Sequence, residues 1–310
     1  MSRTRRIALI VNPAATRTTD QLRERIRAEL APHGLMDVAT PLGAADIRIA
    51  VQHAIDVGAE IIAVLGGDGT IGIAASVLAD TEIPLIPLPG GSTNVLARGL
   101  GWPAAPERAA ERVVTALAQP YRELAIGRLE AAGRTTVFCV NAGIGLDAAT
   151  VAWVERHPQI KRRLRQGAFA LASLGPGWHA LRSGPTLTVH HSDATEGILV
   201  HSLIAACGAP YAYLGPQPLN LLPHVAWDGR LEWVGLTDRS PIRAIRMLLR
   251  GLTNAGHLAG PGVVGGTTRA PLRITAAAPF PVQVDGDPFG EVTEITLAPG
   301  GRLRVFAPGS

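Results

Sequence analysis

The sequence predicts two domains, an N-terminal α/β domain built on a parallel sheet and a C-terminal domain of antiparallel strands. Apolar runs alternate with amphipathic helical segments through the first part of the chain, which is the pattern of βαβ units. Beyond about residue 121 the apolar runs come in pairs without an intervening helix, which is typical of antiparallel sheets. The chain has 310 residues, of which 47% are hydrophobic, and this is enough material for two cores.

In the N-terminal domain, short apolar runs predict the strands of the parallel sheet. The run at 61–65 (IIAVL) has no polar residue, as is typical of a central strand that is buried on both faces. Apolar residues at helical spacing, such as Ile47, Val51 and Ile55, predict helices between the strands. The expected strands lie at 6–11, 36–39, 61–65 and 85–88, and the expected helices at 20–30, 44–57 and 71–78.

The C-terminal domain is expected to be a β-sandwich with helical insertions near 147–182 and 240–257. Its expected strands lie at 123–130, 135–140, 186–190, 198–206, 231–236, 272–275, 282–284, 292–297 and 303–306. We place the domain boundary near residue 123. The first domain then comprises 1–123 with a returning tail at about 298–310, and the second comprises 124–297.

Composition limits the classes of protein that this chain can belong to. Cys139 and Cys207 are the two cysteines, and each lies in an apolar run, so we expect buried thiols and neither a disulfide framework nor a cysteine metal site. No apolar run approaches the roughly 20 residues that cross a bilayer, and we expect no targeting segment and a cytoplasmic location. The formal charge of +4 permits attraction to anionic lipid or nucleotide. No nucleic-acid partner is expected.

A first glycine-rich loop, 66–70 (GGDGT), lies between an expected strand and an expected helix. Backbone amides at such a junction form a natural phosphate site. Gly67, Gly69 and Gly72 match the spacing of a dinucleotide fingerprint, but Asp68 would bring an unneutralised carboxylate to a pyrophosphate. An acid at this position is suited to binding Mg²⁺ or to orienting reacting groups. The sequence contains no Walker P-loop.

A second glycine-rich loop, 89–94 (PGGSTN), follows the next expected strand. Parallel sheets bind ligands beyond the carboxyl ends of their strands, so two loops on adjacent strands should face one crevice. The alternative is that both loops are tight turns that begin helices, with Thr70 and Ser92 as N-caps.

Three sequence segments carry a family resemblance: GGDGTIGIAASVL at 66–78, PLIPLPGGSTNVLARGLGWP at 84–103 and NAGIGLDA at 141–148. With them the chain resembles the diacylglycerol kinase catalytic family, which includes bacterial lipid kinases and, more distantly, sphingosine and ceramide kinases. The resemblance implies a Rossmann-like α/β domain, a C-terminal β-sandwich and a nucleotide site in the cleft between them. It also implies transfer of the γ-phosphoryl group of ATP, with Mg²⁺, to a lipid hydroxyl, most commonly that of diacylglycerol to give phosphatidic acid.

Several alternatives to diacylglycerol phosphorylation stay open. The acceptor could be another lipid, namely sphingosine, ceramide, monoacylglycerol or phosphatidylglycerol. NAD kinases share the GGDGT loop, although the GGSTNVLAR segment is of the lipid-kinase type. A non-catalytic regulator that binds nucleotide or lipid is the third alternative, but Asp68, Asp285 and Asp287, the candidate acids, are all present.

The resemblance also implies roles for individual residues. Asn12 would touch the nucleotide, and Asp68 would position the phosphates and the catalytic Mg²⁺, directly or indirectly. The remaining nucleotide-binding positions would be Gly66, Gly67, Gly69, Thr70, Gly90, Gly91, Ser92, Thr93 and Asn94. Asp285 would be the general base that takes the proton of the lipid hydroxyl, with Asp287 beside it as a second acid, and Asp68 is the rival base. Without the resemblance, Asp285 and Gly286 would be interpreted as a hairpin turn.

A structural Mg²⁺ is implied at Asp228, with the backbone of Val225 and Arg230 as further ligands. The chain departs from the family pattern at three places. Residues 12–16 read NPAAT where the family has Asn-Pro-x-x-Gly, Asp287 replaces a glutamate, and 213–216 (YLGP) replace a triple-glycine segment.

Asp147 and the basic segment 156–165 (RHPQIKRRLR) allow two interpretations each. Asp147 begins an expected helix, so it is either an N-cap or an acid of the active-site cleft. The basic segment is either a solvated helix face or a patch that binds the peripheral membrane surface on which a lipid kinase finds its substrate. The oligomeric state, including a homodimer, is left open.

Overall fold

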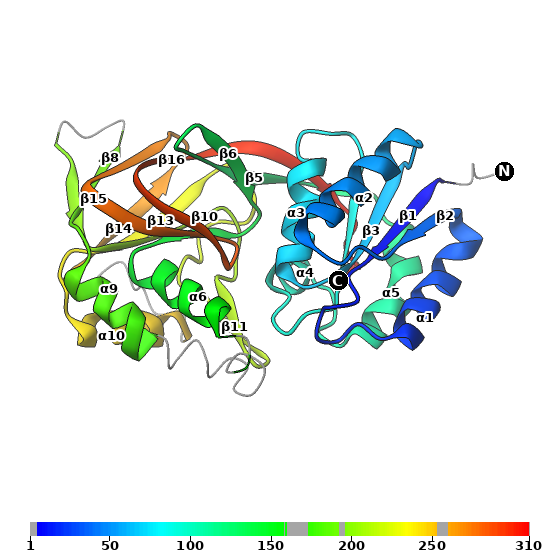
Figure 1. Cartoon of the computed structure of the whole chain (residues 1–310), viewed down its shortest axis with the longest axis horizontal. Coiled ribbons are helices and arrows are strands. Elements are labelled where there is room, and N and C mark those ends of the chain that lie inside the picture. The colour runs from blue at the N-terminus through cyan, green and yellow to red at the C-terminus, as the bar shows by residue number, and fades with distance from the viewer. Residues whose placement is uncertain (1–4, 158, 160–172, 192–195, 253–259, 310) are drawn as a thin grey trace. The chain divides into compact units, whose positions relative to one another are not determined.

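The computed structural model describes residues 5–157, 159, 173–191, 196–252 and 260–309. The chain divides into two compact units, one of Met1–Leu124 with Gly301–Ser310 and one of Ala125–Gly300. The first unit is a parallel α/β structure and the second is rich in antiparallel strands (Figure 1). The fold class predicted from the sequence is therefore confirmed.

The sheet of the first unit has the strand order β16–β4–β3–β1–β2, and its strands run parallel. Every residue of β1, β3 and β4 is buried, because helices cover both faces of the sheet. Helices α1 and α5 pack together, as do α2 and α3 (Figure 1). The strands are β1 (Ile7–Val11), β2 (Leu35–Ala39), β3 (Ile61–Gly66), β4 (Leu85–Pro89) and the end of β16 (Asp287–Val305). The helices are α1 (Asp20–Leu30), the short η1 (Ala31–His33), α2 (Ala44–Asp56), α3 (Asp68–Leu78), α4 (Val95–Gly99) and α5 (Pro106–Leu117).

Four details of the first unit differ from the prediction. Helix α5 was not predicted, and in α2 the buried face is completed by Ala54, while Ile55 is half-buried. Helix α3 begins at Asp68, so Thr70 lies inside the first turn and cannot be its N-cap. The N-cap positions of α3 and α4 are occupied by Gly67 and Asn94.

The second unit has the strand order β14–β13–β10–β7–β15–β16, with β8 and β9 attached beside β15 and with β5 and β6 attached beside β16. Its recorded strand pairs are antiparallel. The strands are β5 (Arg122–Ala131), β6 (Arg134–Phe138), β7 (Asn141–Ile144), β8 (Leu187–His191), β9 (Ile198–Val200), β10 (Ser202–Ala206), β13 (Leu231–Leu236), β14 (Val263–Thr268) and β15 (Leu272–Val284), with β11 (Ala212–Leu214) and β12 (Gln217–Leu219) as a separate pair.

Several strands of this unit have other limits than those predicted. The run at 198–206 is interrupted at His201, and β7 was not predicted. The runs at 272–275 and 282–284 are parts of the single strand β15, which contains a register shift between Thr275 and Phe280. The expected strands at 292–297 and 303–306 likewise belong to β16.

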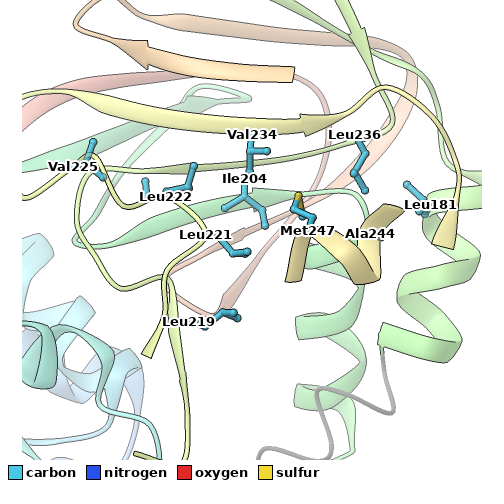
Figure 2. Close-up of a cluster of buried hydrophobic side chains, with 11 residues drawn as sticks. Leu181, Ile204, Leu219, Leu221, Leu222, Val225, Val234, Leu236, Ala244 and Met247 are labelled. Atoms are coloured by element: carbon cyan, nitrogen blue, oxygen red, sulfur yellow. The ribbon is translucent and has the colours of Figure 1, made fainter. Parts of the chain in front are cut away.

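A buried hydrophobic cluster joins the sheet of the second unit to its helices. Ile204 of β10 and Val234 and Leu236 of β13 lie against the segment 219–225 and against Ala244 and Met247 (Figure 2). The helices of this unit are α6 (Leu146–Arg156), the π-helical turn η2 (Ser173–Gly177), α9 (Trp178–Ser183) and α10 (Pro241–Leu252). Among the described residues, no helix has the length and apolar character that crossing a membrane requires.

Candidate functional site

The two glycine-rich loops lie side by side at the carboxyl ends of the adjacent parallel strands β3 and β4. The two strands are in register, with Gly66 opposite Pro89, and the Gly90 amide donates to the Gly66 carbonyl at 2.7 Å. A Cβ atom on Gly91 would lie 2.6 Å from the Cα of Gly67, so only glycine permits this approach. The prediction that the loops follow neighbouring strands is thus correct.

Asn12 joins the end of β1 to the first of these loops. Its side-chain amide donates to the Thr70 hydroxyl at 2.8 Å, and its side-chain oxygen accepts from the Ala14 amide at 2.9 Å. Asn12 and Thr70, which are far apart in the sequence, are therefore adjacent in the fold.

Asp68 connects the first loop to the end of the second, and Asn94 fixes the shape of the second loop. The Asp68 carboxylate accepts from the Val95 amide at 2.5 Å, which is the first backbone amide of α4. Asn94 has a left-handed backbone conformation with φ of 52°, and its buried side chain makes two hydrogen bonds of 2.8 Å to the backbone of Gly91. These contacts hold the shape of the second loop. Ser92, at the loop tip, is exposed, and Thr93 is half-buried.

The start of α3 has the properties of a phosphate site. Its N-cap is Gly67, which offers no side-chain acceptor to the first-turn amides, and the positive end of the helix dipole favours an anion there. These loop residues fit a nucleotide phosphate, with Gly67, Gly69 and Thr70 in the first turn or just before it. The Asp68 carboxylate is of the oxygen type that Mg²⁺ prefers. Among the described residues, no group of three or more His, Cys, Asp and Glu side chains is arranged to hold a metal ion.

Thr18 is a candidate that the sequence analysis missed. Its hydroxyl oxygen is buried and has no hydrogen-bond partner in the part of the chain that the structure describes. A Cβ atom on Gly90 would lie 2.8 Å from this oxygen, so the hydroxyl points at the second glycine-rich loop. The neighbouring Thr19 is the N-cap of α1. The run of hydroxyl residues after β1 is the sequence feature that could have drawn attention to Thr18.

Asp285 lies in a two-residue hairpin turn between β15 and β16. Asp285 and Gly286 both have positive φ angles, 49° and 88°, as the predicted type of turn requires. The Asp285 carboxylate accepts from three successive backbone amides, those of Cys139 at 2.6 Å, Val140 at 2.8 Å and Asn141 at 3.0 Å. Burial raises the pKa of Asp285 to about 6, although the three amides oppose this shift. The charge of the exposed Asp287 adds to the rise in the pKa.

A buried polar network lies next to this turn. The Gln283 side chain donates to the Asn141 side-chain oxygen at 2.9 Å and to the Asp147 carboxylate at 2.7 Å. It also accepts from the Gly286 amide at 2.7 Å, and the Tyr211 hydroxyl donates to Asp147.

Asp147 is therefore not the N-cap of α6, which is Gly145. The N-cap interpretation was wrong because the Asp147 side chain turns into the core, where burial raises its pKa.

The two cysteines are buried and free, as predicted.

Asp228 lies in a loop that is anchored beside the Asp285 turn. The Trp227 indole donates to the Cys139 carbonyl at 2.6 Å, and the Cys139 amide is one of the three that bind Asp285. The Asp228 carboxylate accepts from the Arg230 amide at 3.2 Å and from its guanidinium at 2.7 Å. The bond to the Arg230 side chain lowers the pKa of Asp228.

As they stand, these residues do not fit the Mg²⁺ that the resemblance implies at Asp228. The Arg230 guanidinium also donates to the His224 carbonyl at 3.0 Å, and Arg269 faces the carbonyls of Asp228 and Gly229. Cationic side chains thus already face the oxygens of this loop, including Asp228, and a divalent ion would have to displace Arg230. Val225, the third implied ligand residue, is buried.

The structure describes only part of the basic segment 156–165. Arg156, His157 and Gln159 are described, and the rest of the segment lies outside the described residues. The Arg156 guanidinium donates to the Ala152 carbonyl of its own helix. The membrane role of this segment stays a prediction.

Comparisons with known proteins agree with this picture. The sequence profile of the diacylglycerol kinase catalytic domain matches residues 6–126. A protein named "Diacylglycerol kinase" from Mycobacterium tuberculosis is 32% identical over 282 residues, covering 89% of this chain and 86% of the relative. "Probable lipid kinase YegS-like" from Pseudomonas fluorescens is 26% identical, with 98% of this chain and 96% of the relative covered.

Solved structures show the same fold. The crystal structure of a diacylglycerol kinase from Bacillus anthracis superimposes with a TM-score of 0.67 at 16% identity, covering 99% of this chain and 98% of the other. Sequence similarity to the mycobacterial enzyme extends over both units, as does the structural similarity. The chain therefore belongs to the diacylglycerol kinase family of lipid kinases.

Proposed function

We propose that this protein is an ATP-dependent lipid kinase that transfers the γ-phosphoryl group to the hydroxyl of diacylglycerol and forms phosphatidic acid. The observation that carries the proposal is that the chain supplies both an anion site and a base. Two interlocked glycine loops offer an anion site, and a carboxylate with a pKa raised to about 6 offers a base. Family membership adds a lipid as the class of acceptor.

The first unit would bind the nucleotide. First-turn amides of α3 would hold the phosphates of ATP, with Asn12 keeping Thr70 in position. Bound Mg²⁺ supplies charge neutralisation on the phosphates. Asp68 would position the phosphates and this ion, while its bond to Val95 keeps the second loop against the first. Asn94 would support the loop from within, because its amide is already bonded to Gly91.

Asp285 would take the proton from the lipid hydroxyl. A pKa of about 6 leaves the carboxylate about nine-tenths ionised at neutral pH and still basic enough to accept a proton. The three amides hold the carboxylate in one orientation, and the Gln283 network holds the turn from the other side. We assign the base role to Asp285 and the positioning role to Asp68, since Asp68 starts the helix at the phosphate loop.

The test is a transfer assay with radiolabelled ATP and Mg²⁺ against separate acceptors in mixed micelles. The acceptors are diacylglycerol, monoacylglycerol, ceramide, sphingosine and phosphatidylglycerol, with NAD in parallel. Labelled phosphatidic acid that is lost in Asp285→Asn is the expected result. Label on another lipid would correct the acceptor, label on NAD would overturn the lipid assignment, and no labelled product would overturn the kinase proposal.

A further inference from the structure

Helix α10 carries an exposed aliphatic stripe. Ile242, Ile245 and Leu249 are 66%, 43% and 56% exposed and recur at helical spacing, so they share one face. They are three of the ten large hydrophobic residues that are exposed in the described part of the chain. The other seven are spread over both units, whereas these three form a continuous stripe on one helix.

The opposite face of α10 anchors the helix to the second unit. Ala244 and Met247 are buried and belong to the cluster that includes Ile204 and Leu236 (Figure 2). The helix thus uses one apolar face for its own core and presents a second apolar stripe outward. Because the inner face is already packed, the stripe is not needed for folding of this unit.

Arginine residues line one flank of the stripe. At about 100° per residue, Arg243, Arg246 and Arg250 lie between the buried face and the exposed stripe. Together with Met247 they line a shallow hollow that is closed on its other side by Gly260, Pro261 and Val263. The helix contains no acidic residue, and the neighbouring Asp238 is paired with Arg243. The exposed surface of α10 is therefore apolar along one line and positive beside it.

We propose that α10 docks this protein on an anionic lipid bilayer, with the helix lying in the plane of the interface. Ile242, Ile245 and Leu249 would enter the acyl region, and the arginines would contact lipid phosphates. A second copy of this chain fits the exposed face of α10 less well than an anionic bilayer does. In a two-fold symmetric dimer, Arg246, which lies near the middle of the helix, would face Arg246 of the second copy, and the two positive charges would repel each other. The proposal goes beyond the proposed catalytic function, and its test needs no turnover.

The experiment is sedimentation of the full chain with phosphatidylcholine vesicles that contain or lack phosphatidylglycerol, at low and high salt. The wild-type protein should bind anionic vesicles and bind neutral ones weakly, and salt should reduce binding. Ile242→Ser is compared with Ile49→Ser on α2, whose side chain is also 66% exposed. Ile242→Ser should weaken binding roughly tenfold, and Ile49→Ser should not. Arg246→Gln should weaken it about fivefold relative to the exposed Arg108→Gln.

Two results would overturn the proposal. One is wild-type protein that ignores anionic vesicles, and the other is Ile242→Ser protein that binds them as well as Ile49→Ser does. A dimer that Ile242→Ser converts to monomer, with vesicle binding unchanged, would assign the stripe to a second copy instead. Circular dichroism checks that each variant is folded. Turnover of short-chain diacylglycerol in detergent separates the two proposals, because it reports on catalysis without a bilayer.

Discussion

Replacing Asp285 by asparagine tests the assignment of the base most directly. An asparagine side chain cannot accept a proton from a lipid hydroxyl, so kcat should fall. The loss of a general base is worth about 10²–10⁴-fold in rate, or about 3–5 kcal/mol of barrier. ATP binding should be unchanged, because the groups proposed to hold the nucleotide, the first-turn amides of α3 and Asn12, are not altered.

The same substitution should change the stability of the fold only slightly. Asparagine keeps an oxygen toward the amides of Val140 and Asn141 but turns an NH₂ group toward the Cys139 amide, which costs about 1–3 kcal/mol. In compensation, the neutral asparagine side chain avoids the desolvation penalty that burial imposes on the ionised Asp285 carboxylate. Raising the pKa from 3.8 to about 6 corresponds to about 3 kcal/mol at pH above 6. The two effects nearly cancel.

The assay measures kcat and KM for the lipid, nucleotide affinity by calorimetry, and the free energy of unfolding in urea. The matched control is Asp80→Asn. Asp80 also has a positive φ of 62°, and its carboxylate accepts from a backbone amide, that of Arg302. A kcat for Asp285→Asn within about fivefold of wild type would refute the base assignment, since it is far short of the loss of a base, and leave Asp285 as a turn residue.

Four further predictions concern protonation, the buried network and metal binding. The value of kcat should rise with pH through about 6, because only ionised Asp285 accepts the proton, and a wild-type profile of kcat against pH without this rise would contradict the assignment. The stability that Asp285 contributes is present below pH 3.8 and is lost as pH rises through about 6. Gln283→Met should lower the free energy of unfolding by about 3 kcal/mol or more, because it strips partners from Asn141, Asp147 and Gly286; urea denaturation that shows less than about 1 kcal/mol would contradict the network. Asp68→Asn should shift the Mg²⁺ dependence of turnover while Asp285→Asn does not, and the reverse result would exchange their roles. Arg230→Leu should create a Mg²⁺-dependent rise in Tm that the wild-type protein lacks, because it frees the Asp228 carboxylate; the same rise in wild type would show that the metal displaces the arginine.

Much of the fold could be predicted because its signals are local. Helix α1 has the predicted limits, and the turn at Asp285 and Gly286 has the backbone angles that an Asp-Gly pair favours. The long strands β15 and β16 could not be delimited from sequence. Their middle sections are exposed or irregular, and the pairing partner keeps them extended.

The candidate site was predicted in its parts but not in its connections. The glycine loops could be recognised because glycine marks places where backbone approaches backbone, as at Gly91. That Asp68 binds the Val95 amide, and that Thr18 faces Gly90, depends on the packing of separate βα units. A single residue in such a loop carries no sequence pattern that reveals its partner.

The sequence by itself determined the parallel and antiparallel halves, the two glycine-rich loops and the family. These properties follow from local periodicity, turn chemistry and contiguous motifs. Only the tertiary structure decided which side chains share an environment. Gln283 reaches Asn141 and Asp147 across more than 130 residues, and Arg230 takes the Asp228 carboxylate. The tertiary structure also decided that the apolar stripe of α10 faces outward, because the sequence does not show which apolar face of this helix is buried in the core.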